Sequence, residues 1–125
     1  MRHHQYNPHF KFYRDPIDFN KYTDRELLQY CLGATMYMPG TKDFAEQIIA
    51  RRRPGLTSMV MCFEDACPEE DVPAAEHNVV VLLNTLNEAL DNGRLRYEDL
   101  PLIFFRVRNH EQFDHFASLL QPEHA

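Results

Sequence analysis

The chain has 125 residues, of which 44% are hydrophobic and 26% are charged, and its formal net charge is −6. This composition is typical of one globular domain and excludes a disordered chain. The acidic balance argues against a sequence-independent nucleic-acid binder, which needs a basic surface. No apolar run approaches the roughly 20 residues of a membrane span, and the polar N-terminus lacks the apolar core of a signal peptide. We therefore expect a cytoplasmic protein without a nucleic-acid or membrane partner.

Residues 1–22 are predicted to form an extended N-terminal lead-in, because they combine Pro8 and Pro16 with scattered aromatic side chains. So many aromatic residues predict that the segment packs across a surface of the protein or of a partner. Thr23 and Glu26 then have the spacing of a capping box, which predicts a short helix. Gly33 is placed to end that helix.

The chain next alternates between strand and helix. Residues 34–38 predict a first strand that stops at Pro39 and Gly40, and Thr41 is placed to cap the helix that follows. Residues 56–66 contain a short apolar run that ends in Glu64 and Asp65. A run of this length and composition predicts a strand that is buried on both faces.

The second half of the chain repeats the pattern. Asp71 is a suitable N-cap for a long helix whose apolar residues recur every three or four positions. Residues 100–108 predict a third strand, and Asn109 can cap a final helix. The short connections indicate parallel βαβ crossovers. A small flavodoxin-type sandwich is the weaker alternative, because no glycine-rich phosphate loop supports it.

Charged residues follow two of the predicted strands. Because side chains alternate along a strand, Arg106 and Arg108 share one face of the third strand. If the neighbouring strands are parallel, Glu64 and Arg106 emerge at the same edge, where ligands bind in α/β sheets. Two interpretations remain open for this edge. One is a structural salt bridge between Arg106 and Glu64 or Asp65; in the other, Arg106 clamps a substrate carboxylate while the acids orient a metal-bound water or a proton donor.

Three motifs carry a resemblance to a known family: Tyr37-Met38-Pro39-Gly40, Cys62-Phe63-Glu64-Asp65-Ala66 and Phe105-Arg106-Val107-Arg108-Asn109. In this order and at this spacing they resemble the N-terminal part of citrate lyase β-subunit-like (CitE-like) proteins, in the HpcH/HpaI aldolase family. The similarity runs from about residue 26 to residue 109.

The resemblance implies a (β/α)8 TIM barrel, of which residues 23–125 would form the N-terminal portion with about three βα units. It also implies a Mg²⁺-dependent lyase or aldolase that cleaves or forms carbon–carbon bonds in a 2-oxo acid or an acyl-CoA ester. The partner would then be a small-molecule carboxylate or an acyl-CoA. The family's direct metal ligands lie on later strands, which have no counterpart in this chain.

The same resemblance implies roles for individual residues. Arg106 would hold the substrate carboxylate, while Glu64 and Asp65 would act in catalysis close to the metal and reach it through water. The metal would polarise the oxo group and stabilise the enolate that forms on cleavage. The substrate-binding residues implied are Pro39, Gly40, Lys42, Arg106 and Arg108.

A closed barrel of this kind takes about 250 residues, whereas this chain supplies three strands. Two open edges and the uncovered inner face predict self-association or completion by a further chain. The alternative function is a catalytically inactive truncated barrel that serves as a ligand-binding or interaction module.

Overall fold

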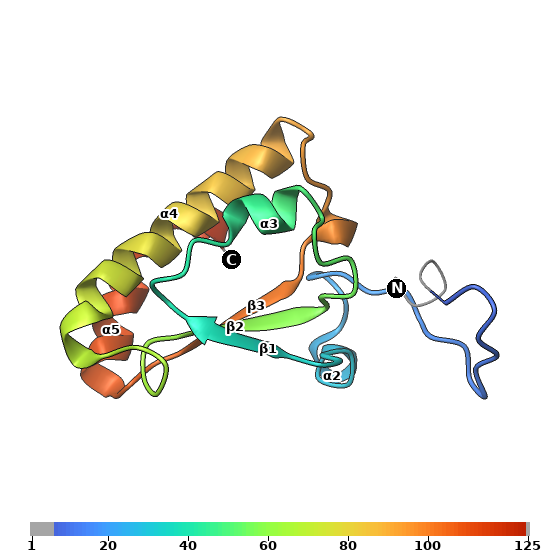
Figure 1. Ribbon diagram of the computed structural model, residues 1–125, viewed down its shortest axis with the longest axis horizontal. Helices are drawn as coiled ribbons and strands as arrows, with labels where there is room; N and C mark the ends of the chain where they lie inside the picture. Colours follow the sequence, from blue (N-terminus) through green and yellow to red (C-terminus); the bar gives the residue numbers. More distant parts are fainter. Residues whose placement is uncertain (1–6, 125) are drawn as a thin grey trace.

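Three parallel strands form the centre of the protein, with helices packed against one face of the sheet (Figure 1). The computed structural model describes residues 7–124. The sheet has the order β1-β2-β3, with β1 at Met36–Pro39, β2 at Ser58–Cys62 and β3 at Leu102–Arg106. Both neighbouring pairs are parallel, as predicted.

The helices of the described residues precede, connect or follow these strands. They are α2 (Arg25–Leu28), α3 (Ala45–Ile49), α4 (Val72–Asp91) and α5 (His110–Leu119), with short 3₁₀ turns η1 (Glu69–Asp71), η2 (Tyr97–Asp99) and η3 (Pro122–His124). Helix α3 links β1 to β2, and α4 links β2 to β3, so each crossover contains a helix. This arrangement is the predicted βαβαβα pattern.

The hydrophobic core lies between the sheet and the helices. All five residues of β2 are buried, which confirms the prediction that this strand is covered on both faces. Met59, Met61 and Phe63 belong to the core on the helical side, because alternate side chains of a strand point to the same face. Helix α4 adds the apolar stripe that includes Val79, Leu82, Leu83 and Leu86.

The opposite face of the sheet is only partly covered. Tyr37, Val60 and Phe104 occupy one row across the three strands, and the outer two are 59% and 42% exposed. The amino ends of the strands are better protected, because the Ser58 hydroxyl donates to the carbonyl of Leu32 at 2.6 Å. The sheet therefore presents an apolar surface at its middle.

Helix α2 begins one residue later than the sequence predicts. The carboxylate of Asp24 accepts from the N–H groups of Glu26 and Leu27, at 2.9 and 3.3 Å, so the Thr23 cap is wrong. Instead, the Thr23 hydroxyl accepts from the N–H of Asn20 in the preceding turn. Gly33 does not end this helix either, since α2 stops at Leu28. With φ of 62°, Gly33 lies in the turn that leads to β1.

Helix α3 also begins later than predicted. Its first residue is Ala45, and Phe44 occupies the N-cap without a capping side chain, so the prediction that Thr41 caps the helix is wrong. The carboxylate of Asp43 accepts from the N–H of Ala45 at 3.3 Å, so a nearer acid supplies the acceptor that the first turn needs. Asn109, in contrast, is the predicted N-cap of α5 and accepts from the N–H of Gln112 at 2.9 Å.

Residues 7–22 contain turns and extended chain, without a helix or strand. Several of their aromatic side chains lie in solvent, with Tyr13 fully exposed and Phe10 62% exposed. Within the described chain these two side chains do not pack on the protein's own surface, so the prediction that the segment packs across a surface of the protein or of a partner stays open for them through a partner. Tyr22 is also 70% exposed, although its ring lies 5.7 Å from that of Tyr97, whereas Phe12 and Phe19 are half-buried.

Candidate functional site

The carboxyl ends of the three strands meet at one edge of the sheet. Pro39 at the end of β1 pairs with Cys62 at the end of β2, and Cys62 pairs with Arg106 at the end of β3. The chain continues from β2 into Glu64 and Asp65, which places both acids beside the end of β3. This edge is the one at which parallel α/β sheets bind ligands.

Arg106 binds both acids through separate nitrogen atoms. Its Nε lies 2.5 Å from Oε2 of Glu64, and its Nη1 lies 2.7 Å from Oδ2 of Asp65. The three side chains are 41%, 34% and 69% exposed, respectively, so water reaches the cluster. The predicted meeting of anionic and cationic side chains at one edge is therefore present. Solvent-exposed ion pairs contribute only about 0–1 kcal/mol to stability, so this cluster is not a major stabilising element.

The guanidinium group of Arg106 stays fully charged. Partial desolvation acts to lower the pKa of Arg106, but the negative charges of Asp65 and Glu64 outweigh it and raise this pKa above the ordinary value. Nη2 has no acceptor among residues 7–124. Nη2 can therefore donate hydrogen bonds to a further anion while both ion pairs of Arg106 stay in place.

Arg108 lies close to the same loop but contacts main-chain atoms. Its Nη2 donates to the carbonyls of Cys67 and Glu64, at 2.5 and 3.4 Å. Its Nε is buried without a hydrogen-bond partner among the described residues. Arg108 therefore ties the loop after β2 to the end of β3, and it does not share the carboxylates that Arg106 binds.

The loop after β1 is the second part of the candidate site. Gly40 donates its N–H to the carbonyl of Cys62 at 2.9 Å, and Lys42 donates its N–H to the carbonyl of Pro39 at 3.0 Å. The structure thus places all three predicted residues of this loop at the carboxyl edge of the sheet. The Lys42 side chain is exposed.

Helix α4 carries a buried carboxylate that was not predicted from the sequence. Glu76 of α4 is 3% exposed, and its two oxygens contact Nε2 of Gln112 at 2.8 Å and Nδ1 of His115 at 2.9 Å. Gln112 in turn accepts from the N–H of Arg108 at 3.1 Å, so the network reaches the candidate site. The signal was present in the sequence, because Glu76 falls at helical spacing with the buried Val79.

The three cysteines are free and buried. Cys67 follows the acids in the loop after β2 and is 2% exposed. Burial raises the pKa of its thiol, and the charge of Asp71 raises it further, although Arg108 acts in the opposite direction. Since thiolate is the reactive form, Cys67 is unsuited to nucleophilic chemistry.

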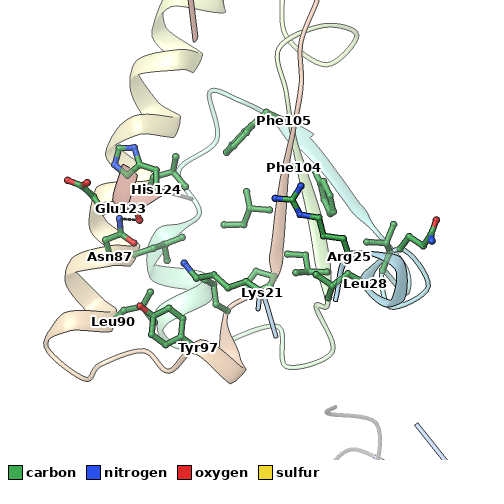
Figure 2. Close-up of a pocket in the computed structure, with 18 residues that line it drawn as sticks. Lys21, Arg25, Leu28, Asn87, Leu90, Tyr97, Phe104, Phe105, Glu123 and His124 are labelled. Carbon is green, nitrogen blue, oxygen red and sulfur yellow. Dashed lines mark hydrogen bonds between the residues drawn. The ribbon is translucent and has the colours of Figure 1, made fainter. Parts of the chain in front are cut away.

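A cavity of about 440 Å³ lies away from the charged cluster, along the outer edge of β3 (Figure 2). Its walls include Phe104 and Phe105 of β3, Leu28 of α2 and Leu90 of α4, with Lys21 and other polar side chains around them. Neither Arg106 nor its two acids line it. The cavity is therefore not part of the candidate site.

The cavity marks where the described sheet ends. Leu102 donates its N–H to the carbonyl of Thr57, and the carbonyl of Arg106 accepts from Phe63, so these β3 residues face β2. Alternate residues of a parallel ladder face opposite sides, so Ile103 and Phe105 direct their main-chain groups to the free edge. The edge of β3 is thus unpaired among residues 7–124.

The acids of the candidate site do not enclose a metal ion. Within residues 7–124, no group of three or more histidine, cysteine, aspartate or glutamate side chains is placed to hold one. Glu64 and Asp65 both contact Arg106. Mg²⁺ needs six nearly octahedral ligands, of which carboxylates commonly supply one or two and water much of the rest. A magnesium ion beside Glu64 and Asp65 would therefore share these carboxylates with Arg106 and take its other ligands from water or from further residues.

Comparison with protein families gives one match that covers most of the chain. A family described as C-C bond lyase of the TIM-barrel fold matches residues 26–125. The chain belongs to this family. No curated protein and no solved structure matches it.

Membership of this C–C bond lyase family agrees with the three parallel strands and their helical crossovers. A complete TIM barrel has eight strands in a closed ring, so the described sheet is an incomplete portion of that fold. The predicted fold class is therefore confirmed. None of the helices in residues 7–124 has both the length and the apolar composition that crossing a bilayer requires.

Proposed function

We propose that this C–C bond lyase family member is the N-terminal part of a Mg²⁺-dependent lyase or aldolase of the HpcH/HpaI, CitE-like kind. The substrate class proposed is a 2-oxo acid or an acyl-CoA ester. The observation that carries this proposal is that Arg106 forms ion pairs with two carboxylates, Glu64 and Asp65, at the carboxyl edge of a parallel sheet. A guanidinium group at such an edge is suited to bind a substrate carboxylate in two-point geometry.

In this proposal each residue of the edge has a distinct part. Arg106 holds the substrate carboxylate through its remaining N–H groups, while Glu64 and Asp65 keep the guanidinium oriented and charged. Cleavage next to an oxo group leaves negative charge on an enolate, and a fixed cation close by stabilises it. Arg108 holds the loop after β2 through its hydrogen bond to the carbonyl of Cys67. The substrate-binding loop after β1 would contribute Pro39, Gly40 and Lys42.

Mg²⁺ dependence rests on the family resemblance. The described residues do not complete a metal site, so we propose that Glu64 and Asp65 meet the ion through water and that its direct ligands lie elsewhere. A cytoplasmic location, a lead-in over residues 1–22 and a barrel portion over residues 23–125 belong to the same proposal. A CoA thioester is the second substrate to test beside a 2-oxo acid.

The alternative proposal is a catalytically inactive ligand-binding or interaction module. It is favoured by the unpaired edge of β3 and by the absence of a metal-ligand cluster among residues 7–124. The two proposals differ in turnover. Ligand binding without cleavage or condensation, in the presence of MgCl₂, would support the module.

Arg106→Ala is expected to weaken the binding of pyruvate in MgCl₂ by about 10–100-fold, because a charge-assisted hydrogen bond contributes roughly 1.5–3 kcal/mol. Arg106→Lys retains the charge without the two-point geometry, so an intermediate affinity is expected. Isothermal titration calorimetry with pyruvate and with acetyl-CoA measures both effects.

The matched control is Arg96→Ala. Arg96 is also an exposed arginine, paired with Asp99 at 2.9 Å, but it precedes β3 and so lies at the opposite end of the strand. Its removal is expected to leave affinity unchanged. Wild-type affinity in Arg106→Ala would contradict the proposed site.

The open sheet predicts association between chains or completion by a further chain. Phe104 lies on the partly covered face of the sheet, in the edge strand β3, and is 42% exposed. Phe104→Lys is therefore expected to reduce self-association and the binding of a hydrophobic dye, as measured by sedimentation velocity and fluorescence. Phe113→Lys, on α5, removes an aromatic that is 52% exposed away from the sheet and serves as the control. A monomeric wild-type protein that binds no dye would refute the expectation.

A further inference from the structure

The loop after β1 is held from two sides. On the sheet side, Gly40 donates its N–H to the carbonyl of Cys62 at 2.9 Å. On the helix side, Nδ2 of Asn78 in α4 donates to the carbonyl of Gly40 at 2.6 Å and to that of Lys42 at 3.1 Å. These contacts join residues 36 and 38 positions apart in the sequence.

An asparagine at this position is chemically suited to the task. Its amide nitrogen carries two hydrogens, so one side chain can bind two main-chain carbonyls at the same time. The segment between β1 and α3 has no helix or strand to bind the carbonyls of Gly40 and Lys42. Without Asn78, the carbonyl of Gly40 would lose its side-chain partner while the helix layer still covers the loop.

We propose that Asn78 is a positioning residue for the candidate site. It fixes the loop after β1 in the place from which Gly40 and Lys42 meet a bound carboxylate. This inference rests on the proposed function, because it assigns the loop to ligand binding. A displacement of about 1 Å in such a group is enough to cost an enzyme about 100-fold, so the anchoring of the loop is expected to appear in ligand affinity.

Helix α4 offers a matched control for this contact. Asn87 lies further along the same helix, and its Nδ2 donates to the carbonyl of Glu123 at 2.8 Å. The chemistry is the same, an asparagine amide bound to a main-chain carbonyl. Its partner is in η3 and not in the loop after β1. Asn87→Ala therefore removes a comparable contact without loosening the candidate site.

The first measurement is hydrogen exchange of the loop amides in the full chain. Asn78→Ala and the isosteric Asn78→Asp are expected to speed exchange of the Lys42 N–H by about tenfold or more, because both lose the donor that holds the loop. Amides of β2 are expected to exchange as in the wild type. Asn87→Ala should leave the Lys42 N–H unchanged.

The second measurement is the affinity for pyruvate in MgCl₂, by calorimetry. Both Asn78 variants are expected to bind about tenfold more weakly, while Asn87→Ala stays within about twofold of the wild type. If the wild type binds and the Asn78 variants bind equally well, the positioning role is overturned and the proposed function survives. If the wild type binds neither pyruvate nor acetyl-CoA, the proposed function fails and the positioning role fails with it. The exchange data still show separately whether Asn78 fixes the loop.

Discussion

Replacing Phe63 with alanine is expected to lower the free energy of unfolding by about 3–5 kcal/mol. Phe63 is fully buried just beyond the end of β2. Its ring centroid lies 4.8 Å from that of Phe116 and 6.5 Å from that of Phe105, and these two rings are 5.1 Å apart. The phenylalanine triad of Phe63, Phe105 and Phe116 thus joins β2, β3 and α5. Truncation would leave a cavity at the meeting point of all three elements.

Urea unfolding followed by circular dichroism measures this loss. Phe113→Ala is the control, because Phe113 belongs to the same helix as Phe116 but is 52% exposed. A change within about 0.5 kcal/mol is expected there. Equal losses in both variants would mean that the triad does not form the centre of the core. Phe63→Leu is expected to fall between the wild type and Phe63→Ala.

Gly40→Ala is expected to destabilise the protein by about 1–3 kcal/mol, although it adds only one methyl group. A Cβ atom at this position would lie 2.8 Å from two ring carbons of Phe63 and 3.0 Å from the Cβ of Ala75. Phe63 is fully buried and Ala75 is part of helix α4, so neither can withdraw without disturbing the core. Thermal and urea unfolding provide the measurement.

Gly55→Ala is the matched control, because no heavy atom lies within 4 Å of a Cβ atom added there. This variant is expected to be neutral or slightly stabilising, through the lower entropy of the unfolded chain. The steric explanation also predicts coupling. In a Phe63→Ala background, Gly40→Ala should cost less than it does alone, because the ring that it meets is gone. Additive losses would contradict this explanation.

Much of the fold could be predicted because it depends on short-range patterns. The apolar run of β2 and the apolar stripe of α4 identify their elements by length and period, and both are found. The parallel order followed from short strand–helix–strand connections. The residues that cap helix starts were less predictable. Asp24, and not the adjacent Thr23, caps α2, and Asp43, and not Thr41, accepts a hydrogen bond at the start of α3. Several residues near a helix start can cap it, and local geometry selects among them.

The charged residues of the candidate site could be predicted from the sequence, but the residues that hold the surrounding loops and helices in place could not. Glu64 and Arg106 were expected at one edge because strand alternation and parallel pairing bring them there, and they are in contact. Asn78 gave no signal, because an asparagine on a long helix is usually a solvated polar residue. Its contacts depend on how closely α4 passes the loop after β1. Glu76 gave a signal in its helical spacing, yet its partners on α5 come from tertiary packing.

By itself, the sequence determined the alternation of strands and helices, the residues at the ends of the strands and the family to which the chain belongs. These properties depend on period, on composition and on which residues stand next to one another. Only the tertiary structure decided that Arg106 binds both acids while Arg108 binds the main chain of the loop after β2. The reason is distance. Which partner a side chain contacts depends on interatomic distances, and those distances are set only when the helices and loops pack on the sheet.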